Sequence, residues 1–147
     1  MPHETTDLKN RTKAFALRII RLYQALPKSG EAQVIGKQIL RCGTSVGAQY
    51  REACRAKSPA DFINKMEGSL QELDETGYWL ELLAESKIMP AEKLTDLQKE
   101  TNELTNIHFR GVRQNNQKES RCLNSSHLHL RAAQVFRIHK SSFKLCP

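Results

Sequence analysis

Apolar residues recur at steps of three and four along the first 110 residues of the chain, which is the spacing of one face of an α-helix. One start is sharply marked, because Ser58 fits an N-cap, Pro59 the first helical position and Asp61 the acidic position of a capping box. The pattern beyond this start predicts a long helix whose seam faces a bundle core. That seam consists of Phe62, Met66, Ser69, Leu73, Thr76, Leu80 and Leu83.

Three more helices are predicted by the same periodicity. One covers about residues 8–26, a second about residues 31–56, and a third begins at Pro90 and loses its pattern near Gly111. Because the connections are short, neighbouring helices should run antiparallel. The sequence therefore predicts an all-α fold, an antiparallel up-down-up-down four-helix bundle over residues 1–110.

Residues 111–147 follow neither the helical nor the strand period. They include the polar run "RQNNQKES" at residues 113–120, followed by a segment that has some apolar content but no regular spacing. A segment without an apolar face has little to bury in a core. We therefore predict that this part of the chain is a basic, poorly ordered tail.

Two glycines, Gly43 and Gly47, lie in the middle of the second predicted helix. A phosphate-binding loop would need a preceding strand and a G-K-[ST] ending, and neither is present. Each glycine inside a helix costs about 1 kcal/mol relative to alanine, so the pair needs a physical reason. The favoured reason is the close approach of another helix to the side that also carries Gly36 and Tyr50, and the alternative is that the glycines are merely tolerated.

The net charge of +7 is unevenly distributed. Residues 1–57 carry 11 basic and 4 acidic side chains, residues 58–110 carry 5 and 11, and residues 111–147 carry 7 and 1. A basic protein often binds nucleic acid. Here the predicted bundle is itself polarised, so its charges could also match those of a second copy.

Projected at 100° per residue, basic residues of the helix predicted at about residues 31–56 form one line, and acidic residues of the helix that begins at Pro59 form another. A solvated charged face is the simplest interpretation of either line. Alternatively, the basic line of one copy meets the acidic line of the next, and such a heterologous contact closes into a ring if its rotation allows. The residues predicted at this interface between copies are Gly43, Gly47, Tyr50, Glu67, Asp74, Tyr78 and Glu81.

Sequence motifs for catalysis and metal binding are missing. There is no Glu-x-x-His pair of the di-iron bundles, no nucleophile elbow around Ser45, and the four cysteines are far apart. We therefore predict no catalytic residues, no metal and no cofactor. No apolar run has the length of a membrane span and the first residues do not resemble a signal peptide, so the expected location is the cytoplasm.

Three blocks of the chain, "LPK", "GTSVGAQYREA" and "DETGYWLELL", together resemble the bacterial four-helix bundle proteins encoded in intervening sequences of 23S rRNA genes. The resemblance extends over residues 7–110. The accessory variability proteins of diversity-generating retroelements are related to this family and share the bundle.

The resemblance implies a compact helical protomer, a homopentameric ring and a basic surface suited to RNA or DNA. The retroelement relatives also engage a reverse transcriptase. No catalytic residues come with the resemblance, and only the basic positions within the matching blocks can be carried over as candidate nucleic-acid contacts. They are Arg11, Lys13, Arg18, Arg21, Lys37, Arg41, Arg51 and Arg55.

The sequence thus favours a non-enzymatic homo-oligomer, a pentamer by resemblance, that binds RNA or DNA through backbone phosphates. No helix-turn-helix, aromatic RNP pair or zinc finger indicates that bases are read. The alternative is a protein–protein adaptor, for example one that docks a reverse transcriptase or a ribosome-associated partner and has no direct nucleic-acid role.

Overall fold

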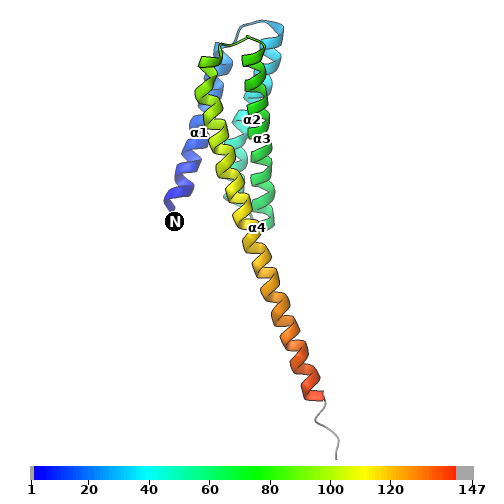
Figure 1. Cartoon of the computed structure of the whole chain (residues 1–147). Helices are drawn as coiled ribbons and strands as arrows, with labels where there is room; N and C mark the ends of the chain where they lie inside the picture. Colours follow the sequence, from blue (N-terminus) through cyan, green and yellow to red (C-terminus); the bar gives the residue numbers. More distant parts are fainter. Residues whose placement is uncertain (1, 142–147) are drawn as a thin grey trace, which may run out of the picture. The chain divides into compact units, whose positions relative to one another are not determined.

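The computed structural model describes the backbone of residues 2–141 and the side chains of residues 7–117. This part of the chain forms four helices: α1 (Pro2–Ala25), α2 (Gly30–Ala53), α3 (Pro59–Glu85) and α4 (Ala91–Ser141) (Figure 1). The chain divides into one compact unit, Met1–Val112, and a second unit, Arg113–Pro147. The first unit holds α1, α2, α3 and the first part of α4.

Consecutive helices of the first unit run in opposite directions, as the short connections predicted (Figure 1). The helix α2 packs on both α1 and α3. The remaining neighbours are shown by individual contacts, since Arg11 of α1 pairs with Glu100 of α4 and Gly77 of α3 lies against Thr101 of α4. The predicted all-α four-helix bundle is therefore confirmed.

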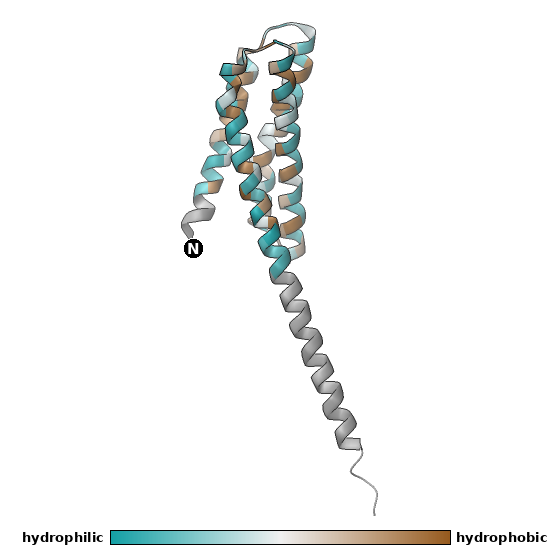
Figure 2. Cartoon of the chain, viewed as in Figure 1, coloured by the Kyte–Doolittle hydropathy of each residue, from teal (hydrophilic) through white to brown (hydrophobic). Residues whose placement is uncertain are grey.

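The core follows the predicted seam of α3. Six of its seven positions are buried, and Phe62 is half-buried because Ile63 takes the inward position at the start of the helix. Figure 2 shows apolar and hydrophilic positions interspersed along the bundle helices, as expected for helices with one buried face. The largest fully buried side chains include Phe15 and Ile19 of α1, Ile39 of α2 and Leu104 of α4.

The start of α3 has the predicted cap. The backbone N–H of Asp61 donates to Ser58 Oγ over 3.1 Å, and the carboxylate of Asp61 accepts from the backbone N–H of Lys57 over 3.0 Å. Pro59 occupies the first helical position, where its missing N–H costs nothing. These contacts satisfy donors that a helix N-terminus otherwise leaves open.

The glycines of α2 allow the close approach that the sequence predicted, but the approaching helix is α1 of the same chain. A methyl group built at Gly43 would lie 2.7 Å from Ile19 Cγ1, and one at Gly36 would lie 2.6 Å from Leu26 Cδ1. At Gly47 the nearest atoms belong to Thr12, at 3.5 Å. These distances place α1 directly over the bare side of α2.

The prediction that Gly43, Gly47 and Tyr50 lie between copies is therefore wrong. All three are buried inside the bundle, and the ring of Tyr50 lies edge-on against His108 of α4, with ring centres 5.6 Å apart. The sequence pattern identified a contact between helices but could not tell an intramolecular neighbour from an intermolecular one.

The fourth helix is longer than the sequence predicted. The apolar pattern ends near Gly111, whereas α4 continues to Ser141. The run "RQNNQKES" contains no proline and several good helix formers, so it can be helical without presenting a face to a core. The last six residues of the predicted tail lie outside the described residues.

Candidate nucleic-acid interface

A cleft with a cationic rim lies between α1 and the beginning of α4. Arg18 and Arg21 are three residues apart on α1, so they are neighbours on one helix face. Lys93, from the first turn of α4, completes the set of three cations. The cleft has a volume of about 400 Å³, and its remaining lining is apolar, formed by Leu22, Ala25, Met89 and Leu97.

The cations of this cleft have no acidic partner among the described residues. None of the described residues that line the cleft is a carboxylate. Neither arginine, nor Lys93, forms an ion pair or a side-chain hydrogen bond within the part of the chain that the structure describes. The cleft therefore offers three positive charges to an anion from outside.

Arg11, which the sequence placed among the nucleic-acid contacts, is occupied within the bundle. Its Nε lies 2.7 Å from Glu100 Oε1 and its Nη2 lies 3.1 Å from Glu100 Oε2, so the pair is bidentate. Nη2 also donates to Glu103. The hydrogen bonds to Glu100 raise the pKa of Arg11 above its ordinary value. Arg11 therefore joins α1 to α4 through these carboxylates, and its role as a phosphate contact stays a prediction.

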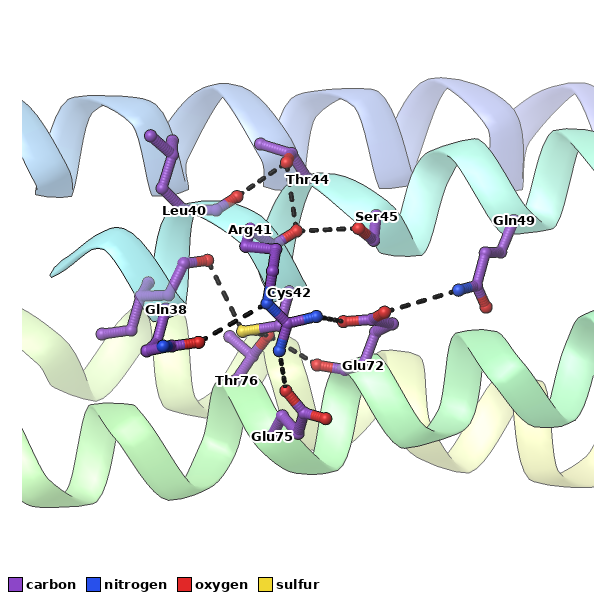
Figure 3. A network of polar contacts seen from close by, with 11 residues as sticks. Gln38, Leu40, Arg41, Cys42, Thr44, Ser45, Gln49, Glu72, Glu75 and Thr76 are labelled. Carbon is purple, nitrogen blue, oxygen red and sulfur yellow. Dashed lines mark hydrogen bonds and ion pairs between the residues drawn. The ribbon is translucent and has the colours of Figure 1, made fainter. Parts of the chain in front are cut away.

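Arg41 has a similar role between α2 and α3, as Figure 3 shows. Its guanidinium donates to Glu75, and its Nη1 lies 3.5 Å from Glu72 Oε2. The hydrogen bond with Glu75 is the main reason that the pKa of Arg41 is raised. Burial raises the pKa of Glu72, and the nearby Arg41 partly opposes this effect. The acidic residues that meet this part of the basic line thus belong to the same chain.

Beside this ion pair, Cys42 is fully buried and its thiol donates to the carbonyl of Ile39 over 3.6 Å. The hydroxyl of Thr76 lies 3.1 Å from Cys42 Sγ and 2.7 Å from the carbonyl oxygen of Glu72 (Figure 3). Burial raises the pKa of the Cys42 thiol, which disfavours the reactive thiolate. This cysteine is a packing residue of the core.

The remaining predicted contacts are exposed and unpaired among the described residues: Lys37 and Arg51 on α2, and Arg55 in the turn after it. Arg55 shares its surroundings with both signs of charge, because Lys65 pairs with Glu52 over 2.8 Å beside it. On α1, Lys13 is likewise exposed. The predicted cations therefore come from different parts of the bundle: Arg11, Arg18 and Arg21 lie on the side of α1 that meets α4, and others lie on α2 or just beyond its end.

The predicted acidic surface of α3 is exposed. Glu67, Asp74 and Glu81 are exposed, and the side chain of Tyr78 is 54% exposed despite its edge-on contact with Trp79. Three of these residues line a hollow of about 280 Å³ between α3 and α4. Its lining is Leu73, Asp74, Gly77, Tyr78, Glu81, Thr101, Asn102 and Thr105.

Gly77 in this hollow differs from the glycines of α2. A methyl group built at Gly77 would meet only Thr101 Cγ2, at 3.9 Å, among the described residues. Among the described residues, packing therefore gives no reason for a glycine at this helical position. The hollow beside it lies at the surface between α3 and α4.

His108 is the buried histidine of the described bundle. Its Nδ1 lies 2.8 Å from the carbonyl oxygen of Leu104, and its Nε2 is buried without a hydrogen-bond partner. Burial lowers the pKa of His108. Over the same described residues, no three His, Cys, Asp or Glu side chains gather as metal ligands would, and no helix has the length and apolar character needed to cross a bilayer.

The sequence reasoning missed Lys93 and the apolar lining of the cleft. One signal was present, because Lys93 follows Pro90 and so falls in the first turn of a predicted helix, where a positive charge is unfavourable. Met89 and Leu97 carried no such signal, since a buried apolar residue does not show whether a cleft opens beside it.

Comparison with known proteins identifies relatives of the bundle. The family model described as 23S rRNA-intervening sequence protein matches residues 4–109. A crystal structure of a protein with unknown function from the S23 ribosomal protein family, from Bacteroides thetaiotaomicron, is 40% identical to this chain with a TM-score of 0.67. The alignment covers 71% of this chain and 96% of that one. A search of curated proteins gave no match.

Proposed function

Because this chain belongs to the 23S rRNA-intervening sequence protein family, we propose that it is a non-enzymatic, cytoplasmic protein that assembles with copies of itself and binds RNA or DNA through backbone phosphates. One observation supports the proposed binding of RNA or DNA. Six of the eight cations in the matching blocks have no ion pair within the described residues: Lys13, Arg18, Arg21, Lys37, Arg51 and Arg55.

Phosphate contacts of this kind give affinity without base specificity. Each cation that neutralises a phosphate releases condensed counterions, so binding weakens steeply as salt rises. Several copies in one assembly would repeat the same cations, and a strand long enough to span them would gain avidity. The proposal therefore requires modest affinity for each chain and a marked dependence on ionic strength.

The test is a titration of a labelled single-stranded RNA of mixed sequence at about 50 mM and about 200 mM salt. Replacing Lys37 and Arg51 by glutamine together should weaken binding and reduce the slope of log affinity against log salt by about 0.7 for each phosphate that is no longer neutralised. The matched control is Lys99→Gln, which removes an exposed cation of α4 outside the proposed set. Absence of RNA and DNA binding at low salt would contradict the proposal.

The proposed self-association rests on the exposed face of α3. The hollow at Gly77, the exposed ring of Tyr78 and the carboxylates of Asp74 and Glu81 form a surface that intramolecular packing leaves unused. A heterologous contact on this face can close into a ring, and the pentamer implied by the family resemblance is one such closure. Apolar contact around Tyr78 would have to supply most of the affinity, because exposed ion pairs contribute about 0–1 kcal/mol each.

The same hollow supports a second candidate, a protein adaptor without a nucleic-acid role. A basic segment of a different protein, such as a reverse transcriptase or a ribosome-associated protein, would match Asp74 and Glu81 as well as a second copy would. The two functions separate in the RNA titration: an adaptor would fail to bind RNA at low salt and would still capture its protein partner through Tyr78.

A further inference from the structure

We propose that the cleft between α1 and α4 binds a phosphomonoester carried on a nucleoside, either the phosphorylated end of a strand or a free nucleotide. The inference rests on the nucleic-acid binding proposed above and assigns a distinct task to one part of the cationic surface. Arg18, Arg21 and Lys93 would hold the phosphate, and the apolar lining would contact the nucleoside.

The charge of the cleft fits a terminal phosphate better than an internal one. A phosphodiester within a strand carries a single negative charge, whereas a phosphomonoester carries about −1.5 to −2 at neutral pH and exposes three acceptor oxygens. The described lining of the cleft gathers three cations from two helices and no carboxylate. The exposed cations Lys37 and Arg51, by contrast, lie in different turns of α2, which suits successive phosphates of a backbone.

The position of Lys93 at the start of α4 also favours an anion bound in this cleft. Lys93 lies in the first turn of α4, where the helix dipole places a partial positive charge and disfavours a cation by about 0.3–1 kcal/mol. Glu92, the acidic residue of that turn, is not part of the cleft lining. An anion bound beside Lys93 would relieve both the dipole and the repulsion among the three cations.

The apolar lining favours an organic phosphate over inorganic phosphate. Leu22, Met89 and Leu97 have no hydrogen-bonding group to offer a small, strongly hydrated ion. A volume of about 400 Å³ lies within the range of sites that hold small organic ligands, about 300–1,000 Å³. None of the described residues that line the cleft is aromatic, so base stacking and base selection are not expected.

The experiment compares three versions of one short RNA with the full-length protein at constant ionic strength: a 5′-phosphate, a 3′-phosphate and hydroxyls at both ends. At least one phosphorylated RNA should bind about tenfold more tightly than the hydroxyl form, the gain expected from a charge-assisted hydrogen bond. AMP should compete for this gain, and inorganic phosphate should compete much less.

Three single variants, Arg18→Gln, Arg21→Gln and Lys93→Gln, should each reduce the preference for the phosphorylated end. Lys99→Gln is the matched control and should retain it. Circular dichroism of each variant reports whether the bundle is intact, and the other two variants keep the test valid if one of them does not fold.

The outcomes distinguish a failure of the proposed cleft site from a failure of the proposed nucleic-acid binding. Equal binding of all three RNAs, together with no binding of AMP, would overturn the inference and leave backbone binding in place. Competition by inorganic phosphate as strong as that by AMP would overturn the nucleoside contact. Binding of AMP without any binding of RNA would support the cleft as a nucleotide site and contradict nucleic-acid binding, whereas no binding of AMP or of any RNA would contradict both.

Discussion

Two glycines of the same bundle differ in the space beside them, and this difference should appear in the stability of their alanine variants. Gly43 faces Ile19, a fully buried and β-branched residue with little freedom to change rotamer, whereas among the described residues a new methyl group at Gly77 would have one neighbouring atom, at 3.9 Å. Gly77→Ala should therefore stabilise the bundle by about 0.5–1 kcal/mol through helix propensity, and Gly43→Ala should destabilise it by about 1–3 kcal/mol through overpacking.

Urea unfolding of both variants tests this prediction, because each serves as the other's control. A raised or unchanged midpoint for Gly43→Ala would show that the assignment of Gly43 to a tight contact with α1 is wrong, and a lowered midpoint for Gly77→Ala would show that its surroundings are not open. Gly77→Ala has a second use, since loss of self-association without loss of stability would indicate that a partner occupies the hollow.

His108 makes stability depend on pH. Burial lowers its pKa below the ordinary value of about 6.5, so the folded protein keeps the ring neutral where the unfolded chain binds a proton. The unfolded state then binds more protons below about pH 6.5, and stability should fall by up to about 1.4 kcal/mol for each pH unit as pH decreases towards the folded-state pKa.

The measurement is the free energy of unfolding at about pH 7.5 and about pH 5.5 for the protein and for His108→Gln. The variant lacks the titrating group, so the part of the pH dependence that belongs to His108 should disappear. An identical pH dependence in the two proteins would show that the ring takes up a proton inside the bundle.

At the scale of helices, Arg11 is the residue that joins α1 to α4. Its bidentate pair with Glu100 is partly buried, with the two side chains 30% and 20% exposed. Arg11→Lys should therefore cost about 1 kcal/mol although the charge is kept, because an ammonium cannot form two parallel hydrogen bonds. Lys13→Arg is the control on the same helix, and a neutral effect of Arg11→Lys in thermal unfolding would argue against the clamp.

The helices themselves could be predicted from the sequence because their signals are local. The Ser58 cap and the four-three spacing of α3 depend on residues that are close in the chain, and both were confirmed. The partners of Arg11 and Arg41 could not be predicted, since Glu100 and Glu72 lie on other helices whose rotation and height no periodicity defines.

The same limit explains the cleft and the glycines. Lys93 joins Arg18 and Arg21 only because the antiparallel bundle brings the start of α4 to the last turns of α1, and an apolar residue such as Leu97 gives no sign of a neighbouring opening. Gly43 indicated a close helix, but only the folded chain shows that this helix is α1. Sequence reasoning thus placed these residues on helices but could not group them across helices.

At the scale of the whole molecule, the proposed assembly predicts which of the two units contains the contact between copies. If the exposed face of α3 forms the contact between copies, the first unit, Met1–Val112, should contain the interface. The full chain of 16.8 kDa should then form a particle of about 84 kDa, five copies by the family resemblance, and a chain ending at residue 112 should keep the same number of copies.

Absolute mass by light scattering decides the number of copies in each case. Replacing Asp74 and Glu81 by lysine should reduce that number, because like charges would then face a basic neighbour, and the same substitution at Asp96, an exposed acid of α4 outside the hollow, should not. A full-length protein that is monomeric would contradict self-association itself. An oligomer that survives the Asp74 and Glu81 changes but dissociates without residues 113–147 would move the interface from α3 to the second unit.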